Sequence, residues 1–385
     1  MSTVHQVGGN QLMLLQNGSE FFPQLCAAID AARHFVYLET YIFAADATGH
    51  LVAAALRRAA TRGVAVHLLL DGFGTAELPP QWVDDMRVSG VEVLWFRRSI
   101  SPWSLHRNRL RRMHRKLAAM DGEVAFVGGI NIIDDMPAGA EFAMPRLDYA
   151  VRVQGALAGE MLAAMRHLWG VVSWASLRRS GYKLGWRFSG GKPAAFTTAT
   201  LLLRDNLRHR RDIERAYLKA IAGAQHEILI ANAYFLPGRT LRRALRLAAQ
   251  RGVRVQLLLQ GRVEYRLQHY ATHALYERLL ASGIEIYEYQ ASFLHAKVAV
   301  VDGRWATVGS SNIDPFSLLL AREANLLVRD EGFAAELRAS LHAAIAGHAQ
   351  RVEAMGSGVL KRLLARFSYG LVRFAVGMLG ISRRD

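Results

Sequence analysis

Two copies of one short pattern combine a histidine, a lysine and an aspartate at the same spacing. The copies are His114-x-Lys116-x4-Asp121 and His295-x-Lys297-x4-Asp302. An imidazole can act near neutral pH as a nucleophile, an acid or a base, and a lysine can stabilise negative charge on oxygen. The repeated pattern therefore indicates chemistry at an anionic centre such as a phosphodiester.

A glycine-rich segment that ends in asparagine follows each copy. Asn131 and Asn312 each lie 17 residues after their histidine, and Ser310 belongs to the second segment. Backbone N–H groups beside glycine and a side-chain amide can bind phosphate oxygens. These three residues are therefore candidate phosphate ligands.

Four carboxylates need a separate explanation. Asp121 and Asp302 each precede a glycine between two apolar stretches, so they either open a hairpin turn or contact the reacting atoms. Asp148 and Glu323 align within two strand-like runs, LDYAVRV and REANLLV. We expect each of this second pair to orient a catalytic imidazole, unless it is a surface charge on an edge strand.

The surrounding sequence is repeated as well. HFVYLETYIF at 34–43 resembles HEILIANAYF at 226–235, and RGV before VHLLLDG resembles RGV before VQLLLQG. The chain is therefore an internal duplication whose long period favours two facing lobes. Each lobe would deliver one histidine and one lysine.

Short apolar runs alternate with helical patterns in both halves. The expected strands are 34–43, 65–71, 91–96, 226–235, 253–260 and 284–289, and the expected helices are 50–62, 81–89, 239–251 and 270–282. This alternation predicts an α/β fold in which helices cover a mixed sheet. Each histidine and lysine would then lie at i and i+2 of one strand and share a face.

Composition limits the class of protein. A chain of 385 residues with 51% hydrophobic residues can bury large cores, and the single cysteine, Cys26, excludes an internal disulfide framework and suits a reducing compartment. We expect no secretory signal and no spanning helix. The net charge of +16 indicates an anionic partner, either nucleic acid or a phospholipid surface.

Residues 95–112 and 169–188 mix arginine with tryptophan, which suits a membrane interface or stacking on single-stranded bases, although these could also be loops with solvated arginine and buried tryptophan. The C-terminal segment favours the phospholipid surface. The pattern of residues 351–385 predicts a basic amphipathic tail that either lies in a membrane interface or docks on the core.

The repeated motifs resemble the phospholipase D superfamily, and the stretches RRMHRK, GGIN, IANAYFLPG and WATVGSSNIDP more narrowly resemble bacterial cardiolipin synthases of the shorter B type. The resemblance implies two tandem phospholipase D-like lobes in a pseudo-twofold monomer with one active site between them. We expect the first lobe at 1–190, the second at 191–350 and the tail at 351–385.

The resemblance also implies the reaction. A phosphatidyl group would pass from phosphatidylglycerol to a second phosphatidylglycerol through a phosphatidyl-histidine, with His114 as nucleophile and His295 as acid, or with these two roles reversed. Neither a metal nor another cofactor is expected, nor is an oligomer required. The expected partner is an anionic membrane containing phosphatidylglycerol and cardiolipin, rather than nucleic acid. The expected location is the cytoplasmic face of the inner membrane, as a peripheral protein.

Other functions stay open at this stage. A phospholipase or nuclease of the same superfamily would use the same histidines with water as the acceptor. A membrane scaffold built on a degenerate duplication would need neither His-Lys pair, and both pairs are present.

Overall fold

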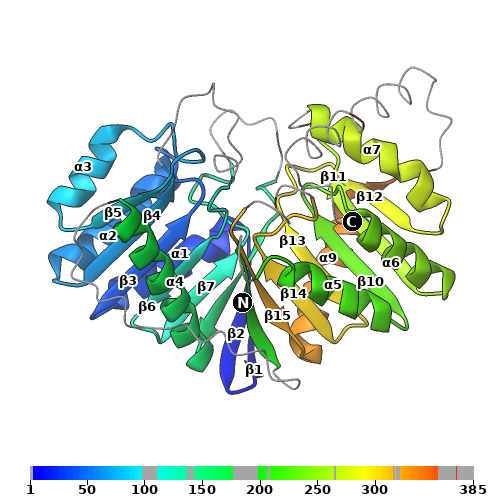
Figure 1. The fold of residues 1–385 in the computed structure, drawn as a ribbon, viewed down its shortest axis with the longest axis horizontal. Helices are drawn as coiled ribbons and strands as arrows, with labels where there is room; N and C mark the ends of the chain where they lie inside the picture. Colours follow the sequence, from blue (N-terminus) through cyan, green and yellow to red (C-terminus); the bar gives the residue numbers. More distant parts are fainter. Residues whose placement is uncertain are drawn as a thin grey trace.

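Two eight-stranded sheets, one from each half of the chain, form the framework of the computed structural model (Figure 1). The structure describes residues 3–97, 111–136, 142, 144–176, 198–205, 209–263, 266–314, 317, 321–353 and 370. Parallel and antiparallel strands occur in each sheet, and helices cover both. The predicted α/β fold with two similar lobes is therefore confirmed.

The first lobe sets three parallel strands beside an antiparallel group. Its sheet has the order β1 (Val4–Val7), β2 (Asn10–Gln16), β8 (Tyr149–Gln154), β7 (Val124–Gly128), β6 (Leu117–Met120), β3 (Phe35–Thr40), β4 (Ala65–Asp71) and β5 (Glu92–Phe96). Strands β3, β4 and β5 are parallel, whereas β6 is antiparallel to β3 and β7. The outer face carries α1 (Asn17–Ala31), α2 (Ala47–Thr61) and α3 (Pro80–Val88), and the inner face carries α4 (Ala156–Ala175).

The second lobe repeats this arrangement. Its sheet has the order β16 (Ala349–Arg351), β12 (Glu285–Tyr289), β11 (Arg254–Gln260), β10 (Glu227–Asn232), β13 (Lys297–Val301), β14 (Trp305–Gly309), β15 (Glu323–Val328) and β9 (Ala199–Arg204). Outside it lie α5 (Asp212–Gly223), α6 (Arg239–Gln250) and α7 (Arg266–Leu280), and inside it lies α9 (Glu331–His348). Every strand and helix predicted from the alternation is present, with small shifts at the ends.

Local sequence signals explain where these elements begin and how they are buried. Asp46 accepts a hydrogen bond from the backbone N–H of Gly49 at the start of α2, and Asp330 does the same for Phe333 at the start of α9. Such caps satisfy amide groups that lack a partner within the helix. The central strands β4 and β11 are apolar along most of their length because helices or the other lobe cover both faces.

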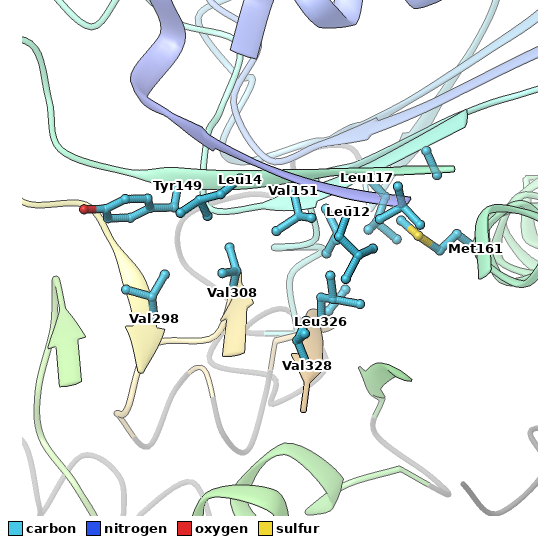
Figure 2. Close-up of a cluster of buried hydrophobic side chains, with 14 of the residues drawn as sticks. Leu12, Leu14, Leu117, Tyr149, Val151, Met161, Val298, Val308, Leu326 and Val328 are labelled. Atoms are coloured by element: carbon cyan, nitrogen blue, oxygen red, sulfur yellow. The ribbon is translucent and has the colours of Figure 1, made fainter. Parts of the chain in front are cut away.

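The inner faces of the two sheets share one hydrophobic core. Leu12 and Val151 of the first sheet lie opposite Val308 and Leu326 of the second (Figure 2). Strand β8 contacts β14, and β7 contacts β15. This continuous core fixes the position of one lobe relative to the other, so residues at the sheet ends can meet across the interface.

The two Asp-Gly hairpins are confirmed, and the carboxylate of each aspartate binds three backbone N–H groups. Asp121 has φ 55° in the turn between β6 and β7, where its carboxylate accepts from the backbone N–H groups of Arg33, His34 and Phe35 at 2.6–2.9 Å. Burial raises the pKa of Asp121, but these hydrogen bonds outweigh burial and hold the pKa below its usual range. Asp302 does the same for residues 225–227.

Two expectations concern segments that the structure covers only in part. The boundary at 190 and most of the tail at 351–385 lie outside the described residues. Among the described helices, none combines the length and apolar character needed to cross a bilayer.

We expect Asp121→Asn to lower the free energy of unfolding by about 1–3 kcal/mol, because the new amide group would face a backbone N–H that now donates to the carboxylate. Asparagine tolerates the positive φ, so the turn itself should form. Urea unfolding measures the change, and Asp302→Asn should match it. A large loss of turnover in a variant of unchanged stability would instead show that the aspartate acts in the chemistry.

Candidate active site

Each histidine of the repeated pattern lies on a segment that pairs with the opposite lobe. The backbone N–H of His114 donates to the carbonyl of Arg322 at 2.9 Å, and that of His295 donates to the carbonyl of Leu147 at 2.8 Å. Arg322 and Leu147 donate in return to the residues two positions before each histidine, at 2.7 and 2.9 Å. The lobe interface therefore determines where both histidines lie.

The prediction that each histidine is part of a strand was wrong. Strand β6 begins at Leu117 and β13 at Lys297, so His114 and His295 precede these strands. The reason is that their backbone groups bond across the lobe interface rather than within their own sheet.

The side chains cross the interface in the same way. His114 Nδ1 lies 3.1 Å from Glu323 Oε2 and 3.1 Å from the carbonyl of Ser310, both in the second lobe. His295 Nδ1 lies 2.6 Å from Asp148 Oδ2 in the first lobe. Because these partners are acceptors, each Nδ1 carries a proton and Nε2 is left for chemistry. The structure thus brings both predicted carboxylates to the two imidazoles.

Burial controls the protonation of this group. The side chains of His114 and His295 are 16% and 12% exposed, and those of Glu323 and Asp148 are almost fully buried. Burial lowers the pKa of both imidazoles, most strongly for His295, which also has Lys297 nearby. Burial raises the pKa of Asp148 to about 7. Burial therefore shifts the pKa values of His295 and Asp148 in opposite directions, so the two groups compete for the proton of their short hydrogen bond.

Both lysines are buried beside the histidines. Nζ of Lys116 donates to the carbonyl of His114 at 2.8 Å, and Nζ of Lys297 donates to the carbonyl of His295. Burial, with a smaller contribution from the charge of Lys297, lowers the pKa of Lys116 to about 7. The charges of both Lys116 and Lys297 also lower the pKa of His114, so the two His-Lys pairs form one electrostatic site.

The asparagines and the serine differ in what they offer a phosphate. Asn131 Oδ1 accepts from the backbone N–H of Ile42 at 3.2 Å, so its amide N–H₂ remains a donor. Asn312 lies buried at the equivalent position. The hydroxyl of Ser310, a predicted phosphate ligand, donates to Glu323 Oε2 at 2.5 Å. In this structure Ser310 therefore holds the carboxylate of Glu323.

The first lobe has a glycine where the second has this serine. A Cβ on Gly129 would lie 2.2 Å from Asp148 Oδ1, so a side chain there would displace the carboxylate. The shorter aspartate thus fits against glycine, whereas the longer Glu323 is held by Ser310. This difference makes the two histidine–carboxylate pairs inequivalent.

Two positioning residues were missed by the sequence-based prediction. Asp71, at the end of β4, accepts from the backbone N–H of Met113 at 2.8 Å, and Gln260, at the end of β11, accepts from that of Leu294 at 2.8 Å. Met113 and Leu294 directly precede the two histidines. The signal was the alignment of VHLLLDG with VQLLLQG, whose last polar residues coincide.

A buried ion pair occurs beside one histidine only. Arg115, between His114 and Lys116, bonds Glu39 at 3.0–3.1 Å, and both side chains are almost fully buried. Burial raises the pKa of Glu39 to about 7 although Arg115 opposes the shift. The corresponding residues of the second lobe are alanines.

No group of three histidine, cysteine, aspartate or glutamate side chains with metal-site geometry occurs in the described parts of the chain. The charged groups around the histidines include two lysines, Arg146, and two carboxylates already bonded to imidazole. These residues suit binding of an anion between the lobes, because ammonium groups stabilise negative charge.

Comparison with known proteins gives consistent matches over most of the chain. A family model described as "Cardiolipin synthase, PLD-like domain" matches residues 25–136 and 217–345. Cardiolipin synthase B of Escherichia coli K12 is 38% identical over 347 residues, which cover 90% of this chain and 83% of that protein. Cardiolipin synthase 1 of Bacillus anthracis is 30% identical, covering 80% and 61%.

The solved structure of phosphatidylserine synthase from Haemophilus influenzae Rd KW20 has a similar fold. Its TM-score is 0.69 at 15% identity, and the match covers 98% of this chain and 96% of that one.

Removing the side-chain acceptor of Asp71 or of Gln260 should slow turnover of a phosphodiester substrate. Asp71→Ala and Gln260→Ala each free a backbone N–H directly before a histidine, so we expect kcat to fall about 10- to 100-fold with a smaller change in KM. Asp71→Asn and Gln260→Glu keep an acceptor oxygen and should lose less. Steady-state kinetics and thermal unfolding test this, and an unchanged kcat in a folded alanine variant would contradict the positioning role.

Proposed function

The chain belongs to the cardiolipin synthase family with phospholipase D-like domains, and on this premise we propose that it joins two phosphatidylglycerol molecules into cardiolipin and releases glycerol. The observation that supports the reaction best is the pair of imidazoles, each held through Nδ1 by a carboxylate of the other lobe. Two such imidazoles beside two lysines provide a nucleophile, an acid and charge stabilisation in one site.

In the first step, neutral Nε2 of His114 attacks the phosphorus of one phosphatidylglycerol. The bond from phosphorus to the headgroup glycerol oxygen breaks, and that oxygen takes a proton from Nε2 of His295. Glycerol leaves, and a phosphatidyl group is bonded to His114. The imidazole of His114 becomes cationic on attack, and the carboxylate of Glu323 on Nδ1 stabilises that charge.

In the second step, the headgroup hydroxyl of another phosphatidylglycerol gives its proton to His295 and attacks the phosphorus. The bond to His114 breaks, which yields cardiolipin and restores both imidazoles. Two displacements predict retained configuration at phosphorus. The lysine ammonium groups and the side-chain amide of Asn131 would offset charge on the non-bridging oxygens.

The inequivalent pairs support this assignment of roles. Asp148 has one short bond to His295 and no serine hydroxyl, and burial raises the pKa of Asp148 to about 7, so its carboxyl can supply a proton to the pair near neutrality, which suits an acid. Glu323 Oε2 is shared between Ser310 and His114, and burial holds the pKa of His114 below its usual value although Glu323 opposes the shift, which suits an imidazole that starts neutral.

Membrane lipids as substrates imply that the protein works on a bilayer surface. We infer a peripheral association with an anionic membrane, for which the net charge of +16 is suited. The same proposal places the protein on the cytoplasmic face of the inner membrane and has residues 351–385 contribute to membrane binding.

The reaction can be followed by mass spectrometry of lipids from phosphatidylglycerol vesicles. We expect the wild type to form cardiolipin and glycerol, and His114→Ala and His295→Ala to lose at least about 10³-fold in rate, because each removes a group required in both steps. His226→Ala, an exposed histidine outside the site, is the matched control and should keep full activity. Rapid quenching in alkaline denaturant should yield a peptide in which His114 carries the phosphatidyl group.

Other products would overturn the proposal. Phosphatidic acid in place of cardiolipin would identify water as the acceptor and the protein as a phospholipase. A phosphatidyl group on His295 would reverse the two roles.

The pH profile of kcat/KM for a water-soluble short-chain phosphatidylglycerol should be a narrow bell. Its acid limb should lie below pH 6.5, because burial lowers the pKa of His114 and the imidazole must be neutral. Its alkaline limb should lie near pH 7, because Lys116 and the His295–Asp148 pair lose protons there. Activity that still rises between pH 8 and 9 would contradict these protonation states.

A further inference from the structure

An aromatic side chain stands exposed beside the segment that carries His114. Phe73, in the turn between β4 and α3, is 63% exposed. The guanidinium of Arg112 lies 4.8 Å from the centroid of its ring. Because Arg112 precedes His114 by two residues, this aromatic–arginine pair lies next to the segment that carries His114.

The second lobe has the same two positions with the residue types exchanged. Arg262 corresponds to Phe73, and Phe293 corresponds to Arg112. Here Phe142 fills the space: its ring centroid lies 5.0 Å from that of Phe293, and the guanidinium of Arg262 lies 5.1 Å from it. The aromatic ring is thus packed in the second lobe and open to solvent in the first.

One carboxylate joins the exposed turn to the histidine segment. Asp71 Oδ1 accepts from the backbone N–H groups of Phe73 and Gly74 at 2.9 and 3.1 Å, and Oδ2 accepts from that of Met113 at 2.8 Å. Any surface that binds Phe73 is therefore held at a fixed distance from His114.

We propose that Phe73 and Arg112 form a docking contact for an anionic phospholipid bilayer, with the ring at the boundary of headgroups and acyl chains and the guanidinium on a lipid phosphate. This inference rests on the proposed function, because a lipid substrate must enter the site from such a surface. Aromatic rings favour this depth, and basic side chains are attracted to anionic lipids. The net charge of +16 complements such a bilayer.

A fluorescent probe can report whether this turn meets the bilayer. The chain's single cysteine, Cys26, is buried, so Cys26→Ser provides a background for Phe73→Cys labelled with an environment-sensitive fluorophore. Val88→Cys is the matched control, because Val88 is 89% exposed at the C-terminal end of α3. This helix leads back to the N-terminal ends of the parallel strands, whereas Phe73 follows the C-terminal end of β4. Vesicles of phosphatidylglycerol and phosphatidylcholine are then added.

The probe at 73 should shift to shorter wavelength and be quenched by lipids that carry a quencher at shallow depth, whereas the probe at 88 should not respond. In vesicle co-sedimentation, Phe73→Ala should weaken binding about tenfold and Arg112→Gln about fivefold. Phe73→Trp should bind at least as well as wild type, and Val88→Ala should bind like wild type.

Three results would overturn the docking contact: sedimentation with vesicles while the probe at 73 stays unchanged, equal responses at 73 and 88, or a response at 73 to single-stranded DNA rather than to vesicles. The readout needs no turnover, so it separates the two proposals. Insertion at 73 without cardiolipin formation would leave docking intact and refute the function. Cardiolipin formation without insertion of the probe at 73 would support the function and refute the docking contact.

Discussion

The candidate active site depends on an exchange of hydrogen bonds between the two lobes. The imidazole of His114 is held by Glu323 of the second lobe, and that of His295 by Asp148 of the first. Neither lobe alone has a complete pair, because the acceptor of each imidazole lies in the other lobe. A buried imidazole without its acceptor would lose both its orientation and the stabilisation of its positive charge. The hydrophobic core between the sheets (Figure 2) keeps the donors and acceptors of this exchange within bonding distance.

In the proposed reaction, the same exchange lets a duplicated fold provide two different chemical roles. A symmetric site would give both imidazoles the same proton affinity, whereas a transfer reaction needs one neutral and one protonated imidazole at the start. Gly129 leaves room for the carboxylate of Asp148, while Ser310 donates a hydrogen bond to Glu323. Small differences between the repeats, rather than additional residues, thus distinguish the two pairs.

The scaffold could be predicted largely from the sequence, because its signals are local. Alternating apolar runs and helical patterns gave the correct strands and helices, and Asp-Gly gave the hairpins. The turn-forming alternative for Asp121 and Asp302 also agrees with the structure, since each carboxylate binds three backbone amides. The strand limits near His114 could not be predicted, because that segment bonds to a part of the chain about 200 residues away.

By itself, the sequence determined which residues are available for chemistry: two His-Lys pairs, two asparagines and two aligned carboxylates in a duplicated α/β chain. The tertiary structure decided how they combine. It paired each carboxylate with the imidazole of the other lobe, directed the Ser310 hydroxyl to Glu323, and made Asp71 an anchor for the segment before His114. These pairings depend on how the two sheets pack face to face. The spacing of residues along the chain does not specify which residues of one sheet lie opposite those of the other.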